Sequence, residues 1–79
     1  MGVARVTFAE DCDVFVGGQP DQADQPILDP RRVGQTNQAF MIPNGLHCFS
    51  IAAAPPFSPL WQVGQVSSDL VLDLTFERP

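Results

Sequence analysis

The stretch that decides how this chain folds is "GQTNQAFMIPNGLHCFSI", residues 34–51. At its centre lies Pro43-Asn44-Gly45, where proline fixes φ and the next two residues tolerate positive φ. Apolar residues flank this turn on both sides, so we expect residues 39–51 to form a β-hairpin. Alternation leaves open which face of the second strand points inward, since both faces carry apolar groups. The two faces are His47, Phe49, Ile51 and Leu46, Cys48, Ser50.

Apolar and polar residues also alternate with a period of two in the segments around this stretch, which predicts further strands. These segments are residues 3–10, 12–18, 60–66 and 70–77. The residues expected to face the core are Ala4, Val6, Phe8, Cys12, Val14, Val16, Leu70, Leu72, Leu74 and Phe76. No segment shows a helical pattern.

The 79 residues suffice for one domain. The pattern amounts to about six or seven short strands, separated by turn signals roughly every 8–12 residues. It therefore predicts an all-β fold, a small antiparallel β-sandwich without a substantial helix. An open barrel is the alternative.

A proline- and aspartate-rich segment, residues 19–33, separates the second strand from the central stretch. Pro20, Pro26 and Pro30 exclude a helix of useful length and any central strand. We expect a long loop here, and loops of this length are usually functional or mobile.

The charge of the chain limits its partners. Nine acidic residues stand against four arginines and no lysine, which gives a net charge of −5. Such a surface repels nucleic acids and anionic membranes. No apolar run approaches the ~20 residues of a membrane span, and no signal peptide begins the chain. We expect a cytoplasmic protein, or an envelope-associated one if the chain is a fragment of a larger protein.

The order of these features resembles the PEGA family of small bacterial β-sandwich domains. A strand ends in Gly17-Gly18, a Gly-x-Thr unit precedes a short apolar strand, and a turn leads into a strand of the pattern G-x-H/Y-x-Φ-x-Φ, where Φ is apolar. The matching positions are Gly34, Thr36, Gly45, His47, Phe49 and Ile51. Two features depart from the family pattern: Asn37 stands where proline is common, and the 19–33 loop is much longer. The resemblance implies a surface or scaffold module without enzymatic activity.

The polar side chains do not form a catalytic frame. His47 is the only histidine, and its neighbour Cys48 points to the opposite face of a strand, so a Cys-His nucleophile is geometrically poor. We expect His47 to lie at the rim of the core with its ring bonded to a backbone carbonyl. The two cysteines, Cys12 and Cys48, form either a disulfide or a pair of buried thiols. No enzyme activity and no cofactor are expected.

An acidic corner, Glu10, Asp11 and Asp13, follows the first strand. With the aspartates of the long loop it suggests a calcium site or a small-ligand site as an alternative function. The spacing does not match the calcium-binding D-x-D-x-D-G loop, however. A solvated acidic rim is the preferred interpretation, and no metal site is predicted.

Several residues suggest contact with a protein partner or self-association. Phe15 and Val71 have outward parity on well-alternating strands, and Phe57 and Trp61 flank a proline-rich crossover. Arg31-Arg32 could clamp a carboxylate or phosphate, but the preferred interpretation is that it pairs with the nearby aspartates and pins the loop. The alternative for the apolar residues is that the long loop folds back over them. The candidate interaction residues are Phe15, Arg31, Arg32, Phe57, Trp61 and Val71.

Overall fold

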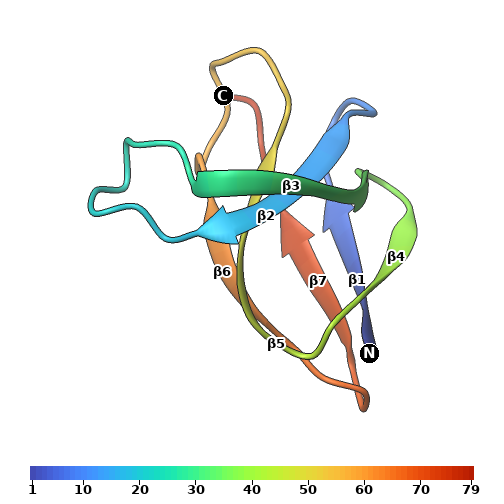
Figure 1. Ribbon diagram of the computed structural model, residues 1–79. Coiled ribbons are helices and arrows are strands. Elements are labelled where there is room, and N and C mark those ends of the chain that lie inside the picture. The colour runs from blue at the N-terminus through green and yellow to red at the C-terminus, as the bar shows by residue number, and fades with distance from the viewer.

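Seven strands and no helix make up the computed structural model, which describes residues 1–79 (Figure 1). The strands are β1 (Gly2–Thr7), β2 (Asp13–Gly18), β3 (Leu28–Gln35), β4 (Ala39–Ile42), β5 (Gly45–Ile51), β6 (Gln62–Val66) and β7 (Val71–Thr75). The all-β sandwich predicted from the alternation is confirmed. The structure contains no helix long and apolar enough to cross a bilayer.

The strands form two sheets that pack face to face. One sheet has three strands in the order β4-β1-β7, and the other has four in the order β3-β2-β5-β6. All neighbouring strands are antiparallel except β1 and β7, which run parallel. In Figure 1, β2 and β3 cross in front of β1 and β7, so the two layers meet at a steep angle.

The core lies between the sheets, where the inward faces of the strands meet. It consists of Ala4, Val6, Phe8, Val14, Ile42, Phe49, Ile51, Val66 and Phe76. Cys12, Val16, Leu72 and Leu74 are partly buried against this cluster, as their parity predicted. The expectation for Leu70 is wrong: it precedes β7 in a bend and is 76% exposed. On β5 the inward face carries Phe49 and Ile51, while Cys48 is also buried, on the outer face.

The expected hairpin over residues 39–51 does not form. β4 pairs with β1 in the three-stranded sheet, whereas β5 pairs with β2 and β6 in the other. Pro43-Asn44 therefore carries the chain from one sheet to the other, and Gly45 completes the turn with φ at 134°. The turn chemistry was identified correctly, but it says nothing about which strands pair across it.

The 19–33 loop is shorter than expected because β3 begins at Leu28. Pro30 is tolerated there because β3 lies at the edge of its sheet, where a missing N–H costs no ladder bond. Asp29 has φ at 48°, and the pairing of β3 with β2 shifts register twice. The loop proper therefore comprises residues 19–27.

A pair of polar side chains, here called the Thr36–Asn37 clamp, holds the corner where the chain leaves β1 for β2. The Thr36 hydroxyl donates to the Glu10 carbonyl (2.7 Å) and accepts the Cys12 N–H (3.0 Å). Asn37 accepts the Phe8 N–H (3.1 Å) and donates to the Phe8 carbonyl (3.0 Å). Thr36 is only 1% exposed, so these bonds replace water for backbone groups at the corner.

The clamp can be tested with Thr36→Val, which keeps the shape of the side chain but removes the hydroxyl. The Glu10 carbonyl and the Cys12 N–H lose their partner, so we expect the free energy of unfolding to fall by about 1–3 kcal/mol. Thr36→Ser retains the hydroxyl and should cost about 1 kcal/mol or less. Urea denaturation measures both, with exposed Thr75→Val as the matched control. Equal losses for Thr36→Val and Thr36→Ser would show that the hydroxyl contributes nothing.

Candidate functional site

An apolar groove lies on the outer face of the four-stranded sheet. The loop 19–27 folds back over this face and buries Ile27, which is 6% exposed. Gly17 permits the close approach, because a Cβ at this position would collide with the carbonyl oxygen of Leu28. The loop and the crossover after β5 leave a groove of about 290 Å³ between them.

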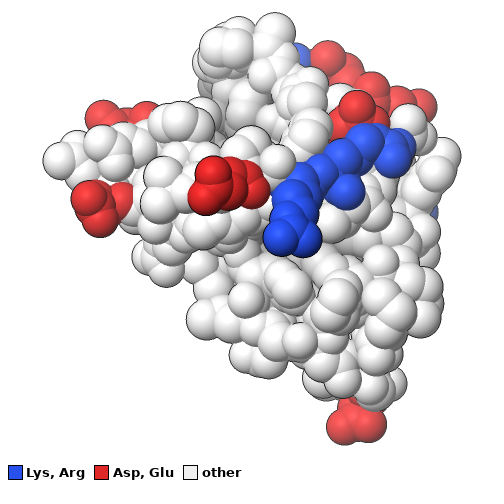
Figure 2. All heavy atoms as spheres, in the orientation of Figure 1, with Lys and Arg blue, Asp and Glu red and all other residues white.

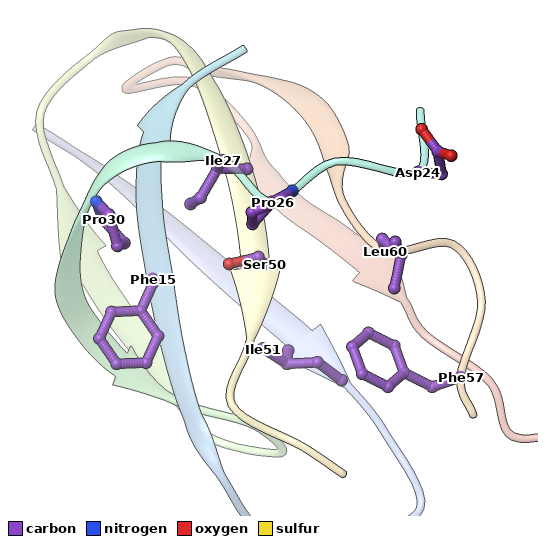
Figure 3. A pocket seen from close by; sticks show the side chains of 9 residues that line it. All are labelled: Phe15, Asp24, Pro26, Ile27, Pro30, Ser50, Ile51, Phe57 and Leu60. Carbon is purple, nitrogen blue, oxygen red and sulfur yellow. The ribbon is translucent and has the colours of Figure 1, made fainter. Parts of the chain in front are cut away.

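The side chains that line the groove come from four parts of the chain (Figure 3). The loop and the start of β3 supply Asp24, Pro26, Ile27 and Pro30; β2 and β5 supply Phe15, Ser50 and Ile51; the crossover supplies Phe57 and Leu60. Phe15 and Pro30 bound one side of the groove and Phe57 and Leu60 the other. Asp24 is the only charged residue among them.

Phe57 anchors the crossover wall to the core. Its ring packs edge-on against Phe8 (centroids 6.0 Å apart) and Phe76 (6.3 Å). Two backbone hydrogen bonds between Ser58 and Glu77 tie the same segment to the C-terminal chain. The groove is therefore bounded by a fixed wall on this side.

The structure divides the other predicted interaction residues among different surfaces. Trp61 does not line the groove; it is half-buried, and its indole Nε1 is buried without a hydrogen-bond partner. Val71 lies on β7 in the three-stranded sheet and is 55% exposed. Of the six predicted interaction residues, only Phe15 and Phe57 line the groove. The loop covers Phe15 only in part, so this side chain is half-buried.

Arg31 and Arg32 are exposed on β3, and Figure 2 shows basic side chains gathered over this strand. Arg32 donates from Nε to Asp13 on the neighbouring strand (2.9 Å), so it pairs across the sheet and not with the loop. Arg31 forms no ion pair. It lines a second, more polar hollow of about 540 Å³ together with His47.

His47 is placed as expected, at the rim of the core. Its Nε2 lies 2.7 Å from the Pro43 carbonyl oxygen, and its ring packs edge-on against Phe49 (6.0 Å). Cys12 and Cys48 are free thiols. Burial raises the pKa of the Cys48 thiol, which keeps it protonated and weakly nucleophilic.

Each carboxylate of the acidic corner has its own partner. Glu10 pairs with Arg78, Asp11 accepts a hydrogen bond from the Asn37 amide (3.1 Å), and Asp13 pairs with Arg32. No group of three or more His, Cys, Asp or Glu side chains lies close enough together to hold a metal ion. The corner therefore acts as a structural junction, and nothing in its geometry favours the calcium alternative.

Arg78 was not identified from the sequence, because no local pattern marks it. Its guanidinium donates to Glu10 and to the carbonyls of Ala54 (2.8 Å) and Pro56 (2.9 Å), and stacks over the Phe8 ring (5.2 Å). Arg78 thus joins the acidic corner to the crossover that forms one wall of the groove. The hydrogen bond with Arg78 lowers the pKa of Glu10, and the same contact raises the pKa of Arg78.

The fold and the groove define a small all-β domain with an apolar depression on one outer sheet face. Comparison of the chain with protein-family models, with curated proteins and with solved structures found no match in any of the three.

The Glu10–Arg78 pair predicts a pH dependence of stability. The folded-state pKa of Glu10 lies below its ordinary value of 4.5, so the pair stabilises the fold above that pH. This contribution is lost as the pH falls through the lowered pKa. We expect Glu10→Gln to be less stable than wild type at neutral pH, with the difference disappearing in acid. Thermal unfolding across the acid range measures it. Glu77→Gln, an exposed carboxylate outside any ion pair, is the control, and a pH-independent difference for Glu10→Gln would contradict the assignment.

Proposed function

We propose that the chain is a non-enzymatic interaction module that binds a segment of a partner protein in its apolar groove. The observation that carries this proposal is the groove itself. It is an open depression lined by aromatic and aliphatic side chains, on a sheet face that would otherwise meet water. Apolar depressions with polar surroundings are typical of protein-binding surfaces.

The size and lining of the groove favour binding over catalysis. A volume of about 290 Å³ lies at the low end for small-molecule sites and suits one large apolar side chain of a partner. Asp24 and Ser50 are the only lining residues with polar side chains. His47 lies outside the groove, so no histidine is available there to activate Ser50.

The charge of the groove indicates what should flank that apolar side chain. Asp24 is the only charged lining residue, in a protein of net charge −5. A lysine or arginine next to the apolar anchor would meet the Asp24 carboxylate favourably. The proposed partner segment therefore has a Leu or Phe followed by basic residues.

We further propose that the domain is of the PEGA type. The positions that carry the resemblance have structural roles: Thr36 forms the clamp, and Phe49 and Ile51 lie in the core. Gly34 packs under Phe40, where a Cβ would overlap the aromatic ring. The free thiols of Cys12 and Cys48 fit a cytoplasmic location.

Titration with short peptides tests the binding proposal. The probes are acetylated, amidated Gly-Phe-Lys-Lys, Gly-Phe-Glu-Glu and Gly-Gly-Lys-Lys, followed by NMR shifts of the Ile27 and Ser50 amides. We expect saturable shifts with the first peptide and weaker ones with the other two. Leu60→Ser should weaken binding about tenfold by removing an apolar wall. Asp24→Asn should reduce the preference for the basic peptide.

Leu46→Ser is the matched control, because Leu46 is 67% exposed and lies outside the groove. It should leave the affinity unchanged. Shifts that spread over the whole surface, or equal affinity for Gly-Phe-Lys-Lys and Gly-Gly-Lys-Lys, would exclude the groove as the binding site.

A further inference from the structure

The outer face of the three-stranded sheet is uncovered, in contrast to that of the other sheet. Side chains of β7 that point to this face, Val71, Asp73 and Thr75, are all exposed. No loop lies over them comparable to the segment that buries Ile27 on the opposite side. A bare apolar sheet face on a small domain costs free energy in water unless something covers it.

An apolar row crosses this face. Val3 on β1 is in register with Met41 on β4 and with Val71 on β7, so the three side chains lie next to one another. Met41 is 58% and Val71 55% exposed. Met1, which precedes β1, is also exposed, at 64%.

A charged row lies next to the apolar one. Arg5 on β1 is in register with Ala39 on β4 and Asp73 on β7. The Arg5 guanidinium leans toward β4, because its Nη2 donates to the Asn37 carbonyl (3.3 Å). Asp73 forms no ion pair within the chain. The face thus carries a positive group over β4 and an unpaired negative group over β7.

We propose that this face pairs with the same face of a second copy of the chain, around a two-fold axis parallel to β1. Such an axis lays β4 of each copy over β7 of the other. Met41 then meets Val71 of the second copy, and Val3 meets Val3. Arg5, displaced over β4, lies opposite Asp73 of the second copy, and symmetry repeats this contact. In this arrangement the apolar residues of one copy meet apolar residues of the other, and each charged side chain meets one of opposite charge.

The proposed dimer leaves the groove free, since the groove lies on the other sheet. It is therefore independent of the proposed function and would present two grooves on opposite sides of one particle. A partner with two suitable segments would bind such a particle with a higher apparent affinity than a monomer. The contact is limited to the face of a short sheet, so the dimer should be weak.

Charge exchange provides the test. In the Arg5→Asp variant, each contact between residue 5 of one copy and residue 73 of the other would bring two carboxylates together. In the Asp73→Arg variant, the same contact would bring two guanidinium groups together. Sedimentation velocity from micromolar to millimolar concentration should show dimerisation by wild type and at least about tenfold weaker self-association by each variant. An equimolar mixture of the two variants restores both opposite-charge contacts, so it should form heterodimers. The double variant Arg5→Asp/Asp73→Arg should dimerise as well.

Val71→Ser should weaken the dimer in the same assay, whereas Leu46→Ser, on the other sheet, should not. Thermal unfolding of each variant shows whether it is still folded. Arg5→Asp also removes the hydrogen bond from Arg5 to the Asn37 carbonyl, whereas Asp73 makes no ion pair within the chain. A weaker dimer in Asp73→Arg therefore cannot be attributed to loss of that hydrogen bond. Strictly monomeric wild type at millimolar concentration would overturn the proposal. So would a dimer that both charge variants leave unchanged.

Discussion

The sandwich depends on the Thr36–Asn37 clamp at the corner between β1 and β2. A chain that leaves one sheet for another must turn at a place where ladder hydrogen bonds end, and backbone groups there need other partners. The clamp provides them from two adjacent side chains, and the same residues also start the turn that leads from β3 to β4. Thr36 and Asn37 therefore fix two crossings between the sheets, the one from β1 to β2 and the one from β3 to β4. Asn37 can do so because it accepts φ at 65°, a conformation closed to proline.

The strands and the core were largely predictable because each strand sets its own faces. A period of two assigns Ala4, Val6 and Phe8 inward whatever the strand pairs with. Pairing itself was not predictable in the same way. Pro43-Asn44-Gly45 has hairpin chemistry, yet β4 pairs with β1 while β5 pairs with β2 and β6, so the two strands belong to different sheets. Likewise Pro30 excludes a central strand but permits an edge strand. That β3 lies at the edge follows only from the order of all four strands in the sheet.

The groove was predictable only in part. Parity singled out Phe15, and proximity to prolines singled out Phe57, but Ile27 and Leu60 have no local signature that places them beside these rings. Their positions depend on contacts across the whole chain. The guanidinium of Arg78 is the clearest example, since it holds the crossover from the far end of the sequence through two carbonyls and one carboxylate. Such a contact joins residues that are far apart in sequence, so no local pattern marks it.

The parallel pairing of β1 and β7 has a mechanical consequence. These are the first and last strands, they lie side by side, and the two chain ends emerge at opposite ends of the domain (Figure 1). Tension applied between the termini is directed along both strands in opposite senses, which loads their hydrogen bonds in shear. The bonds from Val3–Val71 to Thr7–Thr75 then share the load and must break together, whereas a ladder pulled open from one end fails one bond at a time.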